Sequence, residues 1–554
     1  MGTPKLPQDV MLLICQELGA SRDFTTLYHC SMVSRRVASI AVEQLYSVLE
    51  VMDPFIFHAA QSARLWRSIV LSSLGATRYP YCAYIRALSL SSLAECLDYI
   101  RPDEDLRQFF FEGLMQDFLV LQEEGKRRVK STRYRLPPLD NAAITSRCAD
   151  SIIQYTKTLA DDNSTPMTLT HLEASVFPRD ILPAWLSHLG ALTSLQIHDG
   201  SVLGVEAASA IAEHCPNFSE LTCFHCSSSS VDQEVAAFLL TLRPNTLQTF
   251  EILSRNNLNE DTLAALKTHS KSLRVLDLRT LLTSTLKAIH ILSECTALET
   301  LLIEKEASYD GAVDLNEEEL SRFAQWVSSC RALSELSFHH IRNPLPILEQ
   351  VLQTSEIRLE KLHIQGSNFV SREVTRATWM ALGQQKRLKS LTIASDDQPA
   401  NDLDFIRYPE LTDSICHLSS LATLNLLQSH VSSVDIVRIT TALPRLEELS
   451  FGGDLFDESI LEPLSKLHKL ATLTINAITN FTYDGLWSFA QRLYEVGNRG
   501  IRVELLNQWY EAKLTTREEK QLNRYFAKNL KGQIAINYSA DPNGLHEDDF
   551  SDSD

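Results

Sequence analysis

The chain has 554 residues, of which 44% are hydrophobic and 22% are charged. No stretch approaches the roughly 18 consecutive apolar residues that a membrane-spanning helix needs, and the N-terminus shows no secretory signal, so we expect no membrane partner. Lys and Arg number 51 against 70 Asp and Glu, and the resulting net charge of −19 disfavours nucleic acid as a partner. Eleven Cys are an odd number in a long chain, which is typical of reduced thiols inside the cell. We therefore expect a cytoplasmic or nuclear protein.

Residues 1–50 predict a compact helical segment. The stretch from Pro7 to Leu18 reads as a helix, with Pro7 at its start and Gly19 at its end. A segment this short buries little core alone, so its apolar face either packs on the next domain or meets a partner helix. The apolar residues of this segment are Val10, Ile14, Leu18, Leu27 and Val33.

Residues 51–165 predict a mixed connecting region. Ile85–Leu90 carries the signature of a repeat described below and is expected to be a first strand. A helix is predicted over 105–122, capped by Asp103, with Leu106, Phe109, Phe110, Leu114, Phe118 and Leu121 on one face. The basic cluster that follows is interpreted as a solvated loop, with a nuclear import signal or an anion patch as alternatives; it consists of Lys126, Arg127, Arg128, Lys130, Arg133 and Arg135.

An internal repeat organises most of the remaining chain. The pattern Leu-x-x-Leu-x-(Leu/Ile/Phe) recurs with a mean spacing of about 27 residues, inside the range of roughly 20 to 29 residues for leucine-rich repeats. Two longer steps, from Leu298 to Leu333 and from Leu388 to Leu421, need insertions. The twelve copies begin at Leu169, Leu192, Phe218, Leu247, Leu273, Leu298, Leu333, Leu359, Leu388, Leu421, Leu446 and Leu470.

The alternation of leucines within each copy predicts a strand with one buried face, and the residues after it predict a helix that returns to the next strand. One such unit cannot bury its own face, whereas stacked units share a continuous core. The sequence therefore predicts an α/β fold over 166–540: a curved parallel sheet inside, helices outside, and about 12–13 repeats. Residues 501–505 are expected to form the closing strand and 515–528 a charged terminal helix, while 541–554 are expected to be an acidic disordered tail.

Cys215, Cys295 and Cys330 each precede a repeat's first position by three residues, which indicates one buried small-side-chain site. This register resembles the cysteine-containing subclass of leucine-rich repeats. Cys223 and Cys226, close to His214 and Cys215, are an alternative zinc set, but Cys223 falls on an inward strand position and only one C-x-x-C exists. We predict no metal, no cofactor and no enzyme, because the sequence has no phosphate loop, G-x-S-x-G or H-E-x-x-H motif.

The first fifty residues resemble an F-box. The matching pattern is Leu6-Pro7-x-Asp9-Val10-x-x-x-Ile14-x-x-x-Leu18, followed by Asp23, Leu27, Cys30, Val33 and Leu45-Tyr46. It departs from the family where Val33-Ser34-Arg35-Arg36-Val37 replaces Val-Cys-x-x-Trp and Asp23-Phe24 replaces an acidic-Leu pair. With the repeats, the architecture is similar to the F-box/leucine-rich-repeat proteins of fungi.

The resemblance implies a function. In that family the motif docks on the Skp adaptor of a cullin-RING ubiquitin ligase, and the repeats recruit a protein target. The residues implied for the adaptor face are Leu6, Pro7, Val10, Ile14, Leu18, Leu27 and Val33. The alternative is a non-ligase scaffold whose N-terminal helices merely cap the repeats.

The residues beside the second and third repeat positions point out of the concave face. They include Glu173 and Glu448 and the candidate substrate-binding residues Glu220, Glu251, Asp277, Arg279, Glu304, Glu335, His339, Lys361 and His363. A phosphorylated segment needs clustered Arg or Lys, which this face lacks. We therefore expect it to favour a neutral or basic surface, unless selection occurs on the rim or the insertion. Tight binding of a doubly phosphorylated peptide, abolished by Arg279→Ala with Lys361→Ala, would contradict this hypothesis.

Overall fold

A computed structural model gives the fold of the chain. It describes residues 7–47, 59–122, 137–163, 167–174, 179–307, 315–367, 372–395, 409–427, 429, 431–507 and 513–538. The chain divides into two compact units, Met1–Leu273 and Arg274–Asp554, called unit 1 and unit 2. None of the described helices is long and apolar enough to cross a membrane.

Unit 1 begins with a bundle of three helices, α1 (Gln8–Ala20), α2 (Phe24–Val33) and α3 (Arg35–Ser47). Asp23 caps α2 by accepting a hydrogen bond from the backbone N–H of Thr26 at 3.0 Å. Pro7 stands directly before the first residue of α1, as the sequence predicts. The bundle has its own small core, formed by Cys15, Leu27, Ile40 and Ala41 with Met11, Leu12, Leu18, Cys30 and Leu45 packed against it.

Further helices join the bundle to the strands of unit 1. They are α4 (Ala59–Ser73), α5 (Tyr81–Tyr84), α6 (Leu90–Ile100), α7 (Glu104–Phe111), the 3-10 helix η1 (Gly113–Phe118) and α8 (Asn141–Asn163). Asp103 caps α7 by accepting from the N–H of Leu106 at 2.9 Å, as predicted. The prediction of one helix over 105–122 is wrong in its second half. The α-helix ends at Phe111, because Glu112 has an extended backbone with ψ 150°, and Gly113 with a φ of +66° begins the 3-10 helix η1.

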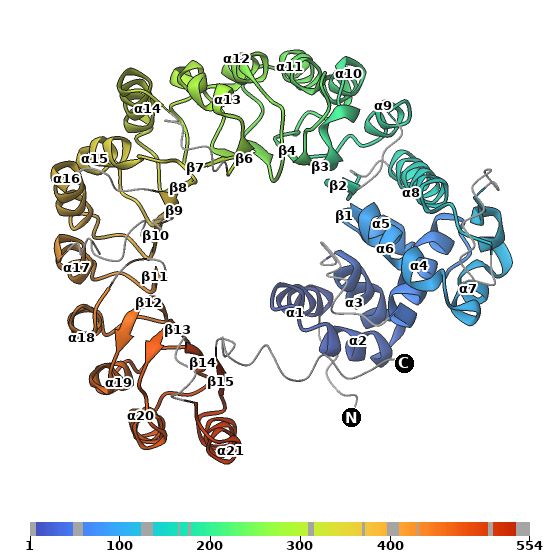
Figure 1. The fold of residues 1–554 in the computed structure, drawn as a ribbon. Helices are drawn as coiled ribbons and strands as arrows, with labels where there is room; N and C mark the ends of the chain where they lie inside the picture. Colours follow the sequence, from blue (N-terminus) through green and yellow to red (C-terminus); the bar gives the residue numbers. More distant parts are fainter. Residues whose placement is uncertain are drawn as a thin grey trace, which may run out of the picture. The chain divides into compact units, whose positions relative to one another are not determined.

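Five parallel strands in unit 1 follow one another in sequence order: β1 (Ala87–Ser89), β2 (His171–Ala174), β3 (Ser194–Asp199), β4 (Glu220–His225) and β5 (Thr249–Ile252). Residue Leu88 of β1 pairs with Leu172 of β2, so the expected first strand at 85–90 exists. Helices lie on one side of these strands (Figure 1): α9 (Leu182–Leu186), η2 (Gly200–Val202), α10 (Val205–His214), α11 (Val231–Thr241), α12 (Glu260–Leu266) and η3 (Lys267–His269).

Unit 2 continues the same alternation of strand and helix. Its strands are β6 (Val275–Leu281), β7 (Thr300–Lys305), β8 (Glu335–His339), β9 (Lys361–Ser367), β10 (Ser390–Ser395), β11 (Thr423–Leu426), β12 (Glu448–Phe456), β13 (Thr472–Thr479), β14 (Arg502–Asn507) and β15 (Gln533–Tyr538). Its helices are α13 (Thr283–Lys287), η4 (Ile289–Glu294), α14 (Glu317–Ser329), α15 (Leu345–Gln353), α16 (Arg372–Leu382), α17 (Pro409–Cys416), α18 (Ser433–Ala442), η5 (Glu458–Ile460), α19 (Leu461–Ser465), α20 (Tyr483–Glu495), α21 (Thr516–Tyr525) and the π-helix η7 (Phe526–Leu530).

The predicted α/β leucine-rich-repeat fold is confirmed by the strand register. Each of the twelve predicted copies coincides with one strand, from β2 to β13, and neighbouring strands pair in parallel at equivalent repeat positions, such as Leu195 with Leu221 and Leu449 with Leu473. These leucines are buried, so the repeats share a continuous apolar core within each unit.

The end of the array differs from the prediction. The predicted closing strand at 501–505 corresponds to β14, which begins at Arg502, but this strand does not close the sheet, because β15 pairs with it in parallel, Val503 with Ile534 and Leu505 with Ile536. Helix α21 therefore precedes the last strand. The basic cluster at 126–135 and the acidic residues 541–554 lie outside the described residues.

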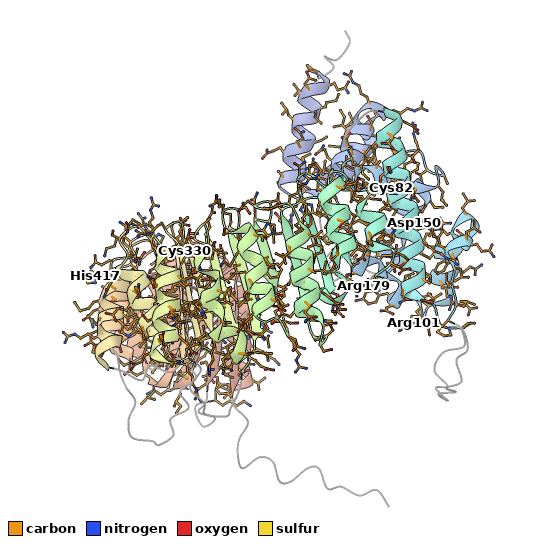
Figure 2. All side chains as sticks on the ribbon, turned by 90° about the horizontal axis from the view of Figure 1, so that it is seen from above. Cys82, Arg101, Asp150, Arg179, Cys330 and His417 are labelled. Atoms are coloured by element: carbon orange, nitrogen blue, oxygen red, sulfur yellow. The ribbon has the colours of Figure 1, made fainter. Side chains whose placement is uncertain are left out.

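The repeat cysteines occupy one buried position, as their register predicts. The Sγ of Cys215 lies 3.3 Å from the carbonyl oxygen of Leu189, and that of Cys330 lies 3.5 Å from the carbonyl of Cys295. Burial raises the pKa of the Cys330 thiol to about 12 and that of Cys82 in unit 1 to about 11 (both labelled in Figure 2), so neither is a reactive thiolate. Cys223 and Cys226 are also buried, and the part of the chain that the structure describes contains no group of three or more metal-ligating side chains.

Candidate functional site

The three-helix bundle carries apolar side chains on its surface as well as in its core. We call the exposed set the bundle face, and its exposed fractions run from 38% at Val10 to 73% at Val33. The sequence predicted three of its members and missed the others, although the spacing of Val10, Leu13 and Ile14 along α1 is a helical signal. The bundle face consists of Val10, Leu13, Ile14, Tyr28, Met32 and Val33.

The remaining residues implied for the adaptor face lie elsewhere. Leu27 is completely buried and packs in the bundle core, because it stands one turn after the capping residue Asp23 on the inward side of α2. Leu18 is half-buried against the same core. Pro7 is exposed at the start of α1, and Leu6 lies outside the described residues. Leu27 is therefore a core residue that stabilises the bundle, and it is not part of the bundle face.

The third helix attaches the bundle to the rest of unit 1. The ring of Tyr46 on α3 stacks on Tyr81 of α5 with centroids 4.7 Å apart, and its hydroxyl lies 3.1 Å from the Oγ of Ser68 on α4. Burial raises the pKa of Tyr46. Further along, Ser73 and Ser151 hydrogen-bond at 2.7 Å and join α4 to α8. One side of the bundle is therefore fixed on the connecting helices, while the bundle face remains solvent-exposed in unit 1.

The strands of unit 1 carry the second candidate surface. Side chains that alternate with the buried leucines point away from the core, and we call this side the open strand face. Glu220, Thr222 and Phe224 are its members on β4, and Thr222 donates a hydrogen bond to Glu251 of β5 at 3.0 Å. The Phe224 ring stacks on His198 of β3 with centroids 4.9 Å apart. Sequence reasoning placed Glu220 and Glu251 here but missed this aromatic pair.

The open strand face of unit 2 has a different character, because two of its acids, Asp277 and Glu335, have cationic partners. Asp277 is buried and accepts three hydrogen bonds from Arg279, the shortest at 2.8 Å. Glu335 and Lys361 form an ion pair at 2.8 Å between β8 and β9. The two predicted bases of this face are thus held by neighbouring carboxylates and form no cluster. The remaining predicted residues, Glu304, His339 and His363, share this face, where Glu304 and His339 are cross-strand neighbours.

Two of these histidines form a close pair. The rings of His339 and His363 lie 4.5 Å apart between centroids. Burial, helped by the nearby His363, His340 and Arg279, lowers the pKa of His339 from its ordinary value of 6.5 to about 4. Burial also lowers the pKa of His363. Both imidazoles are therefore neutral at pH 7 and add no positive charge to this face.

The pair predicts a pH dependence of stability. Between pH 6.5 and about 4 the unfolded chain binds a proton at residue 339 that the folded chain does not, so the free energy of unfolding falls as the pH falls through this window. His339→Gln is expected to make this fall shallower. Urea unfolding at pH 7 and pH 4.5 measures it, and an unchanged pH dependence in the variant would contradict the expectation.

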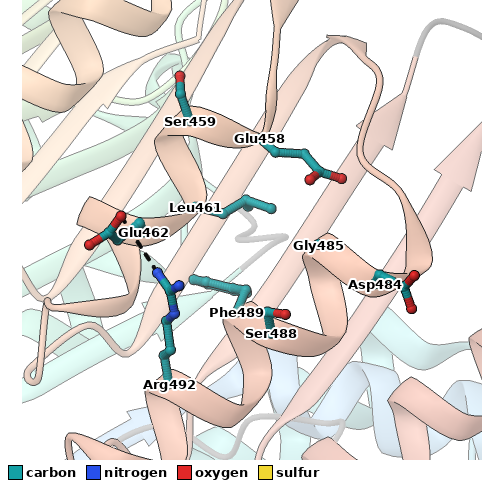
Figure 3. A pocket seen from close by; sticks show the side chains of 9 residues that line it. All are labelled: Glu458, Ser459, Leu461, Glu462, Asp484, Gly485, Ser488, Phe489 and Arg492. Carbon is teal, nitrogen blue, oxygen red and sulfur yellow. Dashed lines mark ion pairs between the residues drawn. The ribbon is translucent and has the colours of Figure 1, made fainter.

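A surface pocket of about 350 Å³ lies on the helical side of unit 2 (Figure 3). Its polar side chains are engaged in local structure: Glu458 accepts hydrogen bonds from the backbone and hydroxyl of Thr482, and Arg492 pairs with Glu462 at 3.7 Å. We interpret the pocket as a groove between the helices of neighbouring repeats.

Comparison with known proteins does not assign the chain to a protein family. No protein-family model matches the sequence, and no curated protein matches it either. Among solved structures, a chain of the yeast Rad7 and Elc1 complex is similar with 14% identity, a TM-score of 0.39, and coverage of 59% of this chain and 83% of that one. A chain of the TLR13–ssRNA13 complex shares 17% identity with a TM-score of 0.30, covering 68% of this chain and 47% of that one.

A third similar structure is the ectodomain of the plant receptor kinase GASSHO1/SCHENGEN3 from Arabidopsis thaliana. It has 10% identity and a TM-score of 0.26, with coverage of 62% of this chain and 47% of that one. At such low scores these likenesses carry no argument about function. The fold assignment rests on the strand register. The chain has a leucine-rich-repeat fold, and its first three described helices form a small bundle with an apolar surface.

Proposed function

We propose that the chain is the substrate-recognition subunit of an SCF-type cullin-RING ubiquitin ligase. The bundle face binds the Skp adaptor, and the repeats bind a protein target. The chain itself is non-catalytic and works in the cytoplasm, the nucleus or both. Its contribution is proximity, because a held target presents its lysines at a high effective concentration to a ubiquitin-charged enzyme.

The observation that carries this proposal is the bundle face. Helix α1 is apolar on two sides: Met11, Leu12, Cys15 and Leu18 face the bundle core, while Val10, Leu13 and Ile14 face solvent. A helix with a second apolar side that its own fold leaves uncovered is typical of a helix that packs against a partner. The F-box resemblance of the same residues identifies that partner as the adaptor.

The second support is the firm attachment of the bundle. The contacts of Tyr46 with Tyr81 and Ser68, and that of Ser73 with Ser151, connect α3 to the helices that precede the repeats. A receptor that positions a target needs such a connection, because a loose tether lowers the effective concentration of the target.

The test is direct binding between the purified full-length chain and a purified Skp adaptor, measured by isothermal titration calorimetry. We expect a one-to-one complex. Absence of binding by the folded wild-type chain would contradict the ligase role and would support the scaffold, in which the repeats bind partners without an adaptor. Association with cullin after addition of the adaptor would extend the result to the assembled ligase.

A further inference from the structure

We propose that the open strand face of β2–β5 binds an extended, arginine-containing segment of the target protein, with one guanidinium group seated on the ring of Phe224. This inference rests on the protein-binding role proposed above for the repeats. It does not depend on the adaptor, since every residue that carries it belongs to the strands of unit 1.

The anchor is an aromatic cluster at the ends of β3 and β4. Phe224 on β4 is 46% exposed, although Cys223 directly before it and Cys226 two residues after it are fully buried. One side of its ring stacks on His198 at an interplanar angle of 13°, and His225 meets His198 edge-on with centroids 4.8 Å apart. The ring is therefore held in place while much of its surface remains open to solvent, as a preorganised binding anchor requires.

Carboxylates lie along this face and beside the cluster. Glu173 and Glu220 lie on the open strand face, and Asp199 lies beside the cluster, with its Oδ1 3.7 Å from the Nδ1 of His225. At the outward positions of β1–β5, all of which are described, no Lys or Arg occurs. Arg86 stands just before β1, outside the strands. Arg255 follows β5 and is the cation nearest the anchor, because its carbonyl oxygen accepts a hydrogen bond from the N–H of Cys226, two residues after Phe224, at 3.0 Å.

Charge complementarity selects the occupant. A guanidinium group stacks on an aromatic ring and pairs with carboxylates at the same time, and it is more weakly hydrated than an ammonium group. A phosphorylated residue, with a charge near −2, would instead meet the carboxylates of this face. The outward positions of β2–β5 follow parallel strands across the sheet, so an extended segment can contact several of them in turn. In unit 2, by contrast, Asp277 and Glu335 already bind Arg279 and Lys361.

The experiment presents the full-length chain with a synthetic array of 12-residue peptides in which Arg, Lys, Gln, Glu and phosphoserine are equally represented at every position. We expect enrichment of Arg over Lys and of both over Gln, Glu and phosphoserine. The best peptide is then measured by fluorescence anisotropy. Its binding is expected to weaken as NaCl rises, since exposed charges are screened beyond a Debye length of about 10 Å at 0.1 M salt.

Variants make the assignment specific. Phe224→Ala is expected to weaken binding of that peptide about tenfold, whereas Phe224→Tyr keeps the ring and the affinity. Arg255→Glu is expected to strengthen binding, because it replaces a cation near the end of β5 by an anion. Leu455→Ala, an exposed apolar position on β12 of unit 2, is the matched control and leaves the affinity unchanged.

Three results would each overturn the inference. The first is enrichment of acidic or phosphorylated peptides, and the second is no enrichment by the wild-type protein over the Phe224→Ala protein. The third is equal affinity of the two proteins for the best peptide, provided circular dichroism shows that both are folded. The variant Val10→Asp with Ile14→Asp is expected to bind the peptide normally. If the wild-type chain binds this peptide but no adaptor, the ligase role is disproved and the peptide site stands. If it binds the adaptor but not the peptide, the peptide site is disproved and the ligase role stands.

Discussion

Replacing Val10 and Ile14 together with aspartate is expected to lower the affinity for the Skp adaptor by at least about 100-fold, which corresponds to about 2.7 kcal/mol at 25 °C. Burying one large aliphatic side chain in a complex contributes about 1.5 to 3 kcal/mol, and the variant removes two of them. It also places two carboxylates in an apolar interface, where an unpaired charge is strongly unfavourable. Because both residues are exposed in unit 1, the substitutions remove nothing from the bundle core.

The matched control is Met380→Asp with Val434→Asp. These two apolar side chains are also exposed, but they lie on α16 and α18 of unit 2. The control is expected to bind the adaptor like the wild type in isothermal titration calorimetry, and thermal unfolding by circular dichroism checks that both variants fold. Equal losses in the two variants would show a nonspecific charge effect, and no loss in the first would remove the bundle face from the interaction.

Leu27 gives a second comparison within the bundle. Leu27→Ala opens a cavity in the core and is expected to cost about 2 to 5 kcal/mol of stability. Any loss of adaptor binding in this variant should therefore accompany a lower melting temperature, unlike the loss caused by Val10→Asp and Ile14→Asp. A normal melting temperature with lost binding would mean that Leu27 contacts the adaptor.

The difference between Leu27 and Ile14 shows what the sequence could not predict. Both are apolar and lie at helical spacing in the same short segment. In α1 the apolar residues occupy two sides of the helix, so periodicity identifies a helix but does not say which side meets the core and which meets solvent. That choice depends on how α1, α2 and α3 pack, which is tertiary information.

The repeats were predictable because one physical requirement acts many times. Each strand must bury alternate leucines against its neighbours, so the pattern recurs and every copy confirms the others. Single events were not predictable in this way. The positive φ of Gly113 and the addition of the last strand β15 each occur once, and no repetition reinforces their signal.

On the open strand faces, too, some features follow from the repeat and others do not. Outward positions such as Glu335 and Lys361 follow from the repeat register alone. Their pairing does not, because it joins residues on neighbouring strands whose side-chain directions depend on packing. Phe224 also occupies such an outward position, directly after the inward Cys223, so the register could have found it. Its stacking on His198 depends on packing and could not be predicted.

Replacing Trp326 with alanine is expected to cost about 3 to 5 kcal/mol of stability in unit 2. Trp326 lies on α14 and is almost completely buried, with its ring stacked on Phe323 at 5.7 Å between centroids. Phe323 in turn meets Phe338 of β8 edge-on at 5.7 Å, so one aromatic stack joins the helix to the next strand. The indole N–H also donates to the carbonyl of Cys295 at 3.2 Å, and the alanine variant would leave that buried carbonyl without this donor.

Trp326→Phe separates these contributions, because it keeps a ring in the stack and removes the donor, and it is expected to cost about 1 kcal/mol for the lost hydrogen bond alone. In a repeat array each repeat is stabilised mainly by its neighbours, so the loss should be local. Hydrogen exchange is therefore expected to accelerate in α14, β7 and β8 while α1–α3 keep their protection and the adaptor still binds. Uniform acceleration throughout the chain would instead mean that bundle and repeats unfold as one cooperative unit, and adaptor binding would then report on the stability of the whole array.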